Sequence, residues 1–317
     1  MKKRCFLGID TSNYTTSLAL VDEEGTVLAN LKKLLPVKQG ERGLRQSDAL
    51  FLHTKQLPEL FRELKPSLSD IELSCVGVSS RPRNTEGSYM PCFLAGVSAA
   101  TAVSATQDIP LYEFSHQSGH IMAALHSSGF DYNNCTGDFL AFHVSGGTTE
   151  LVRVKNAPDE FEVELLGGTA DLNAGQIIDR VGVHLGLPFP SGAHLESYAL
   201  ENTRKIQKKK ISRKGLILNL SGLENIAKKI YSETEDKTYV GAFVFDYIAR
   251  ALLELKNEAF AFYGKMPVVF AGGVMSNSII KNALSSDTDV HFANREVSSD
   301  NAVGTALLAR KKFLNNN

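Results

Sequence analysis

Two histidines four residues apart are the first candidates for chemistry in this sequence. His116 and His120 enclose the stretch "HQSGH", which has the pattern of a helix. A spacing of four residues places both imidazoles on one helix face, where they can share a metal ion. Asp300, directly before the helical stretch that ends the chain, is the candidate third ligand, although its position also suits a helix N-cap. Two histidines and one carboxylate leave coordination positions open and suit iron or zinc.

Two polar turns between apolar runs are candidate phosphate-binding loops. The first lies in "GIDTSNYTT" and the second in "HVSGGTTE". Glycines let backbone N–H groups approach an anion closely, and hydroxyl groups add further donors. Ordinary hairpin turns favour the same residues, so the indication of a nucleotide site comes from the two turns together. The candidate residues are Asp10 and Ser12, assigned as catalytic, and Val144, Ser145, Gly146, Gly147 and Thr148, assigned to phosphate binding.

The elements around these turns repeat. Strand, polar turn and strand occur near residue 10 and again near residue 146, which predicts a duplicated α/β domain with a cleft between the copies. A further motif with two adjacent glycines, "FAGGVMSN" (270–277), follows an apolar run. Either a ligand that lies close to the backbone or a tight turn would explain why both positions are glycine. Periodicity and turn residues further predict helices at 48–64, 91–106, 115–126, 172–186, 239–262 and 301–313 and strands at 73–80, 108–114 and 266–274.

Composition limits the choice of partners and compartments. The 317 residues carry a net charge of -1, so contact with nucleic acid needs a local patch. The run "RKIQKKKISRK" (204–214) is such a patch, either on a nucleic-acid backbone or as a solvated surface; Arg81 and Arg83 are a second possible phosphate contact. Neither a signal peptide nor a membrane-spanning apolar segment is evident, and the four cysteines are widely spaced, so we expect a cytoplasmic protein with reduced thiols.

The motifs together resemble a known family. "LGIDTS", "FHVSGGTTELV", "AGQIIDRVGVHLGLPFPSG", "LNLSGLEN", "FAGGVMSN" and "SSDNA" occur in the order and at the spacing of the TsaD family, from about residue 5 to about residue 310. The resemblance implies an actin/hexokinase/Hsp70-like fold, with 1–112 plus 300–317 as one subdomain and 113–299 as the other. It implies transfer of threonylcarbamoyl from threonylcarbamoyl-AMP to N6 of the adenosine beside the tRNA anticodon. It also implies small TsaB- or TsaE-like partner proteins or a homodimer, and no membrane.

The resemblance assigns roles to individual residues. His116, His120 and Asp300 fall on the metal ligands, with iron favoured over zinc. Residues 144–148 match a phosphate loop, and threonylcarbamoyl-AMP, ATP or ADP is the expected ligand of the cleft. The adenosine side of the site is assigned to Asp179, Gly192 and Asn277, with Gly272 and Gly273 as a floor on which a β-carbon would collide with the base or ribose.

The sequence also departs from the family pattern at acidic positions. A Cys-Asp-Glu-Thr run is replaced by residues 13–16, "NYTT". The family's "GPG" turn and the apolar stretch beside it are replaced by the longer, polar segment "SSRPRNTEGSYMPC" (79–92). Losing a general base typically lowers a rate by ~10²–10⁴-fold. Two alternatives therefore stay open: a paralogue that binds nucleotide or acyl-adenylate as a partner or regulator, and a carbamoyltransferase with an acceptor other than tRNA. Four further single-residue departures are Ser118 for Glu, Thr148 for His, Gln176 for Glu and Leu172 for Asp.

Overall fold

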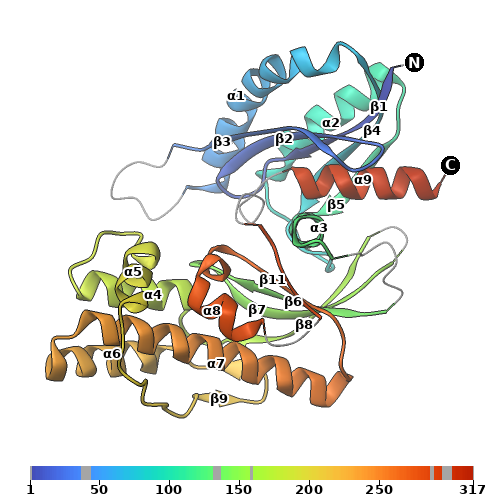
Figure 1. The fold of residues 1–317 in the computed structure, drawn as a ribbon. Coiled ribbons are helices and arrows are strands. Elements are labelled where there is room, and N and C mark those ends of the chain that lie inside the picture. The colour runs from blue at the N-terminus through green and yellow to red at the C-terminus, as the bar shows by residue number, and fades with distance from the viewer. Residues whose placement is uncertain are drawn as a thin grey trace. The chain divides into compact units, whose positions relative to one another are not determined.

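The computed structural model describes residues 2–36, 44–130, 137–157, 160–285, 289–294 and 302–316. Packing of the chain defines two units (Figure 1). Unit 1 comprises Met1–Ser127, Asn156–Val163 and Glu296–Asn317, and unit 2 comprises Ser128–Lys155 and Glu164–Arg295. Residues 113–127, which the sequence-based division placed in the second subdomain, pack with unit 1. No helix within the described ranges is long and apolar enough to cross a membrane.

Unit 1 is built on a five-stranded sheet of order β3-β2-β1-β4-β5. Leu7 and Ile9 face a core shared with α1 and α2, while the alternating residue Gly8 faces α9. A β-carbon at Gly8 would lie 2.4 Å from the Ala302 carbonyl oxygen, so glycine here allows α9 to pack directly on the sheet. The elements are β1 (Lys3–Asp10), β2 (Thr15–Asp22), β3 (Val27–Leu34), α1 (Gln46–Leu64), the 3-10 helix η1 (Lys65–Leu68), β4 (Ile71–Arg81), α2 (Phe93–Gln107), β5 (Leu111–Ser115), α3 (His116–Ser128) and α9 (Val303–Asn315).

Unit 2 is built on a seven-stranded sheet of order β12-β11-β6-β7-β8-β10-β9. Its core joins the sheet to the 27-residue helix α7, most of which is buried. Phe142 on β6 stacks on Phe270 on β11, with ring centroids 4.6 Å apart. The elements are β6 (Phe139–Val144), β7 (Thr149–Lys155), β8 (Glu162–Thr169), α4 (Ala174–His184), α5 (Gly192–Leu200), β9 (Arg213–Lys214), β10 (Ile217–Leu218), α6 (Ser221–Thr234), α7 (Lys237–Tyr263), β11 (Val268–Ala271), the 3-10 helix η2 (Gly273–Ser276), α8 (Ser278–Leu284) and β12 (Val290–Phe292).

Each unit contains one of the two expected hairpins. In unit 1, β1 pairs antiparallel with β2 around the first polar turn. In unit 2, β6 pairs antiparallel with β7 around the second polar turn. The predicted repetition of strand, polar turn and strand is therefore confirmed, and each turn lies at the end of a buried strand.

Candidate functional site

Asp10 is the centre of a buried polar cluster at the end of β1. Its carboxylate accepts hydrogen bonds from the Ser12 backbone N–H at 2.9 Å and from the Ser12 hydroxyl at 3.0 Å. The oxygen atom that accepts from the hydroxyl, Oδ2, also lies 3.1 Å from Nδ1 of His116. Because a carboxylate only accepts, the imidazole donates through Nδ1. The geometry fixes both the first turn and the orientation of one candidate metal ligand.

His116 and His120 lie side by side on α3, as their spacing predicted. Their ring centroids are 4.2 Å apart. Among the residues described, no group of three or more His, Cys, Asp or Glu could hold a metal ion, and Asp300 lies outside the described residues. The pair nevertheless fits one feature of metal sites, because a ligating histidine usually donates its other ring N–H to a carboxylate, as His116 does to Asp10.

The turn that lacks the family's acidic pair is folded around a different buried network. The Thr16 hydroxyl donates to Gln56 Oε1 at 2.6 Å and therefore accepts from Nδ1 of His53 at 2.8 Å. Burial lowers the pKa of His53, which favours the neutral imidazole. Positions 14 and 15 are occupied by Tyr and Thr, so neither supplies a carboxylate; Thr15 is buried and Tyr14 is exposed.

Arg81 is held inside unit 1. Its guanidinium lies 2.5 Å from Glu160 Oε2 and also donates to Asn84 at 2.9 Å. Glu160 additionally accepts from the Ser115 backbone N–H at 2.7 Å, at the residue before His116. Arg81 thus has an intramolecular ion pair where the sequence suggested a phosphate contact, and Glu160 is a supporting residue that the sequence did not identify.

In unit 2, the second polar turn is organised by its serine. The Ser145 hydroxyl accepts from the backbone N–H groups of Gly147 at 3.2 Å and Thr148 at 3.0 Å. A β-carbon added at Gly146 or at Gly147 would have no heavy atom within 4 Å, and neither residue has a positive φ. The fold therefore does not require glycine at these two exposed positions. A β-carbon at Gly175, by contrast, would lie 2.6 Å from the Gly146 nitrogen, so α4 packs directly against the turn.

Asp179 and Gly192 are brought together by the loop between α4 and α5. Asp179 Oδ1 accepts from the Ser191 backbone N–H at 2.7 Å. Gly192 is the next residue, and a β-carbon there would meet only Ile178, at 3.8 Å. Asp179 thus holds the loop through one oxygen atom, and Gly192 is another glycine that packing does not require.

Asn277 is the N-cap of α8. Its side-chain oxygen accepts from the Ile280 backbone N–H at 2.9 Å. Its Nδ2 atom is buried and has no hydrogen-bond partner in the described part of the chain. A buried donor without an acceptor is costly, so this atom is a candidate ligand contact. Glu196 accepts from the backbone N–H and the hydroxyl of Ser278 at 2.7 and 2.6 Å. Sequence patterns did not predict this residue, although its place four residues after Gly192, one helical turn away, was an available signal.

The two glycines of "FAGGVMSN" have different explanations. Gly272 has a φ of 101°, and a β-carbon there would lie 2.3 Å from the Val144 carbonyl oxygen. Packing of β11 on the end of β6 therefore requires this glycine, and the expected collision with an adenosine is not needed to explain it. A β-carbon at Gly273 would have no heavy atom within 4 Å, so the ligand hypothesis rests on Gly273.

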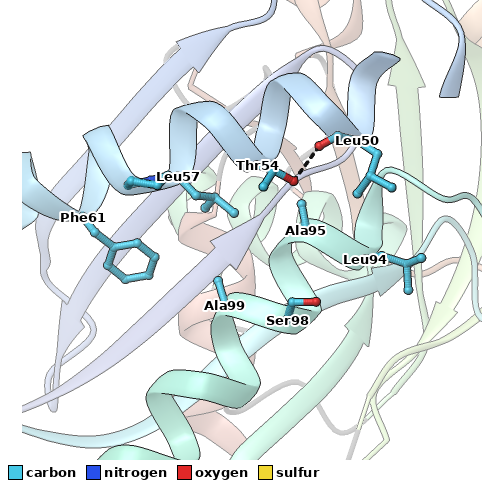
Figure 2. Close-up of a pocket in the computed structure, with 9 residues that line it drawn as sticks. Leu50, Thr54, Leu57, Phe61, Leu94, Ala95, Ser98 and Ala99 are labelled. Carbon is cyan, nitrogen blue, oxygen red and sulfur yellow. Dashed lines mark hydrogen bonds between the residues drawn. The ribbon is translucent and has the colours of Figure 1, made fainter. Parts of the chain in front are cut away.

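Two cavities lie within single units. Figure 2 shows the first, about 540 Å³ in volume, between α1 and α2; its lining carries no ionisable side chain and offers no acid–base chemistry. The second, about 380 Å³, contains Asp179 and lies in unit 2. Its other lining residues are Arg180, Val183, His184, Phe189, Glu224 and Lys228.

Comparison with known proteins decides the family. A sequence profile of TsaD, described as tRNA N6-adenosine threonylcarbamoyltransferase, matches residues 41–307. The chain belongs to the TsaD family. A TsaD relative from Sulfurihydrogenibium sp. (strain YO3AOP1) is 30% identical, over 97% of this chain and 90% of its own length. A relative from Streptococcus suis (strain 05ZYH33) is 28% identical, over 99% and 94%. Both are named tRNA N6-adenosine threonylcarbamoyltransferase.

Solved structures agree with the fold expected of a TsaD protein. HypF from T. kodakarensis gives a TM-score of 0.60 at 13% identity, over 99% of this chain and 48% of that one. The Acidaminococcus fermentans (R)-2-hydroxyglutaryl-CoA dehydratase component A gives 0.53 at 17%, over 98% and 99%. A ROK family glucokinase from Streptomyces griseus gives 0.53 at 12%, over 97% and 99%. At these identities the likeness concerns the fold alone, and the predicted actin/hexokinase-like α/β fold is confirmed.

Proposed function

We propose that this TsaD protein transfers threonylcarbamoyl from threonylcarbamoyl-AMP to N6 of the adenosine beside the tRNA anticodon. The observation that carries the proposal is the family match over residues 41–307. The pairing of His116 and His120 on α3 with Asp10 behind them supports it, because a divergent chain with no use for the site need not keep this cluster.

The residues of unit 1 act at the reacting end of the donor. Asp10 positions His116 through Nδ1, and Ser12 holds the Asp10 carboxylate in place. His116 and His120, with Asp300 as the expected third ligand, would hold a divalent metal, iron or zinc. That metal, when bound, would polarise the carbamoyl carbonyl as the amine attacks.

The residues of unit 2 bind the nucleotide end. Backbone groups of the turn at 144–148 would contact the phosphate, because Gly146 and Gly147 expose the main chain. The free oxygen of Asp179 would accept from a ribose hydroxyl. Gly192 and Gly273 would allow the adenosine to lie against the backbone, and Asn277 Nδ2 would donate to it.

The reaction needs little covalent work from the protein. N6 of the acceptor forms a bond to the carbamoyl carbon, and the bond between that carbon and the phosphate oxygen breaks to release AMP. The proton lost from N6 leaves with the departing phosphate or with water. Holding two substrates in a reactive orientation is a large part of such catalysis, which is compatible with a turn that lacks the family's acidic pair.

The test is transfer of labelled threonylcarbamoyl from its adenylate to unmodified tRNA. The assay contains the purified full chain and TsaB- and TsaE-like proteins, which the family resemblance implies as partners. We expect label on tRNA with the wild-type chain and none with His116→Ala/His120→Ala. Absence of label with the wild-type chain, under conditions in which the adenylate binds, would overturn the proposal.

One observation favours a second function. Tyr14 and Thr15 stand where carboxylates are expected, and Arg81 is bound to Glu160. A chain that keeps the binding glycines but not the acidic pair suits a nucleotide-binding partner or regulator. Binding of the adenylate without transfer to tRNA would favour this function. Transfer to a small-molecule amine instead of tRNA would favour a carbamoyltransferase with a changed acceptor.

A further inference from the structure

The segment that follows α5 and ends with β9 is rich in cations. We name residues 204–214, "RKIQKKKISRK", the basic strap. Seven of its eleven residues are Lys or Arg and none is acidic. The chain as a whole has a net charge of -1, so this positive charge is a local feature.

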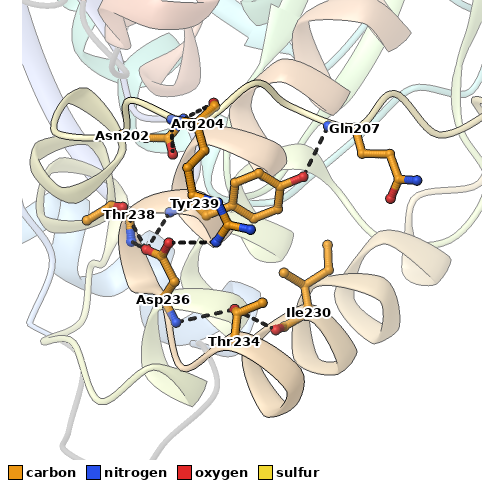
Figure 3. A network of polar contacts seen from close by, with 8 residues as sticks. All are labelled: Asn202, Arg204, Gln207, Ile230, Thr234, Asp236, Thr238 and Tyr239. Carbon is orange, nitrogen blue, oxygen red and sulfur yellow. Dashed lines mark hydrogen bonds and ion pairs between the residues drawn. The ribbon is translucent and has the colours of Figure 1, made fainter.

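The backbone of the basic strap is fixed along α7. The Tyr239 hydroxyl accepts from the Gln207 backbone N–H at 3.1 Å, as Figure 3 shows. The Tyr247 hydroxyl accepts from the Ser212 backbone N–H at 3.0 Å. Arg250 donates to the Lys209 carbonyl at 2.9 Å. Ile211 is buried in the unit 2 core, so the strap is attached by both polar and apolar contacts.

Near each of the two ends of the strap, an arginine is paired with carboxylates of unit 2. Arg204 lies over the Tyr239 ring at 4.6 Å and pairs with Asp236 at 3.1 Å (Figure 3). Arg213 pairs with Glu254 at 2.8 Å and Glu258 at 3.3 Å. These arginines therefore help to hold the strap in place.

The lysines between these ends are different. Lys205, Lys208, Lys209 and Lys210 are exposed, and within the described ranges no carboxylate pairs with any of them. Four ammonium groups of like charge on a fixed backbone repel one another in the absence of a partner. A lysine-rich surface that binds nothing has no need of a fixed backbone. A polyanion binds such a surface with a smaller loss of conformational entropy when the backbone that carries the lysines is already held in place.

We propose that the basic strap binds the phosphodiester backbone of the RNA acceptor. The inference rests on the proposed function, which supplies RNA as the substrate class. Lysine ammonium groups contact phosphates as point charges and give affinity that depends little on base sequence. Each neutralised phosphate releases counterions, so the interaction should weaken steeply as salt is added.

The experiment compares two full-length variants with equal charge. The strap variant is K205Q/K208Q/K209Q/K210Q. The matched control is K2Q/K55Q/K65Q/K265Q, which removes four other exposed lysines that pair with no carboxylate in the described part of the chain. Both changes bring the formal net charge from -1 to -5, that is -1 minus 4. Binding to an unmodified tRNA transcript is measured by fluorescence anisotropy over a series of salt concentrations, and thermal unfolding checks the fold of each variant.

We expect the strap variant to bind the transcript at least tenfold more weakly than the control. We also expect the slope of log Kd against log salt to fall by about 3 for four lost phosphate contacts. Equal affinity and equal slopes in the two variants would overturn the inference. Loss of binding to phosphatidylserine vesicles without loss of tRNA binding would also overturn it, in favour of a membrane surface.

The two proposals fail in distinguishable ways. If the strap is needed for tRNA binding but no label is transferred, the inference stands and the transferase proposal falls. If label is transferred and the KM for tRNA is the same in the strap variant and the control, the transferase proposal stands and the inference falls.

Discussion

The contact between Asp10 and His116 gives the sharpest prediction at the scale of single residues. Asp10→Asn keeps the shape of the side chain but replaces the carboxylate by a neutral amide with only one accepting oxygen. The amide cannot accept from Ser12 and from His116 Nδ1 through two oxygens, as the carboxylate does. Loss of such a supporting carboxylate typically lowers metal affinity by about 10–100-fold. We expect this loss when bound iron or zinc is measured after equilibration with each metal. Asp22→Asn is the control, since Asp22 is also buried on the same sheet but pairs with Lys3; equal loss in both variants would contradict the account.

The glycines of unit 2 give a second prediction, in which folding and binding separate. Gly272→Ala should lower the free energy of unfolding by about 1–3 kcal/mol, because its φ is positive and the new β-carbon meets the Val144 carbonyl. Gly147→Ala should change it by less than about 0.5 kcal/mol, because the position is open. Calorimetry with AMP should show at least tenfold weaker binding to Gly147→Ala. Unchanged AMP binding would remove the turn from the site.

Residue patterns predicted part of the site. The pairing of His116 with His120 follows from helix geometry alone, and the structure bears out their proximity. The reason for Gly272 could not be read from the sequence, because it depends on β6 lying beside β11, and these strands are more than a hundred residues apart. Glu160 was missed for the same reason: its partners Arg81 and Ser115 come from distant parts of the chain.

At the scale of elements, the start of α7 gives a prediction about pH. The Asp236 carboxylate accepts from the Thr238 hydroxyl and from the backbone N–H groups of Thr238 and Tyr239, and these hydrogen bonds lower its pKa. A carboxylate with a lowered pKa stabilises the fold above its unfolded pKa, near 3.9, and this contribution is lost as pH falls through the lower folded value.

Asp236→Ala should therefore lower the free energy of unfolding by about 1 kcal/mol at neutral pH, as for other lost N-caps. Urea unfolding at pH 7 and at pH 3 measures this difference, which should shrink at the lower pH. Glu233→Ala, an exposed change near the end of α6, is the control and should have little effect at either pH. A difference that grows with acidity would mean that the charge of Asp236 does not stabilise the folded state.

The same scale shows why some elements were predicted and others were not. The long periodic pattern of 239–262 predicted α7, and turn residues predicted both hairpins. Helices α5 and α6 were not predicted. Pro188 and Pro190 precede α5, which has only nine residues, and α6 begins inside a motif that was interpreted only as a family signature. The order β12-β11-β6-β7-β8-β10-β9 depends on pairings between distant strands, which local patterns do not encode.

At the scale of the whole molecule, the chain combines a proposed site that lacks the family's acidic pair with the cationic surface of the basic strap. The net charge of -1 gives no overall attraction to RNA, so the proposed recognition of tRNA would have to be local, and we propose the basic strap as the surface for it. Positions 14 and 15 carry no carboxylate, and these positions belong to the reacting end of the proposed site. The transfer step, and not nucleotide binding, is therefore the step to test directly.

The most direct measurement compares two transcripts of one tRNA. One carries the adenosine beside the anticodon and the other carries guanosine at that position. Both are incubated with the chain, the partner proteins and labelled threonylcarbamoyl-AMP, and the nucleosides are then separated. The account predicts labelled adenosine from the first transcript and no labelled nucleoside from the second. Label on neither transcript, or equal label on both, would contradict it.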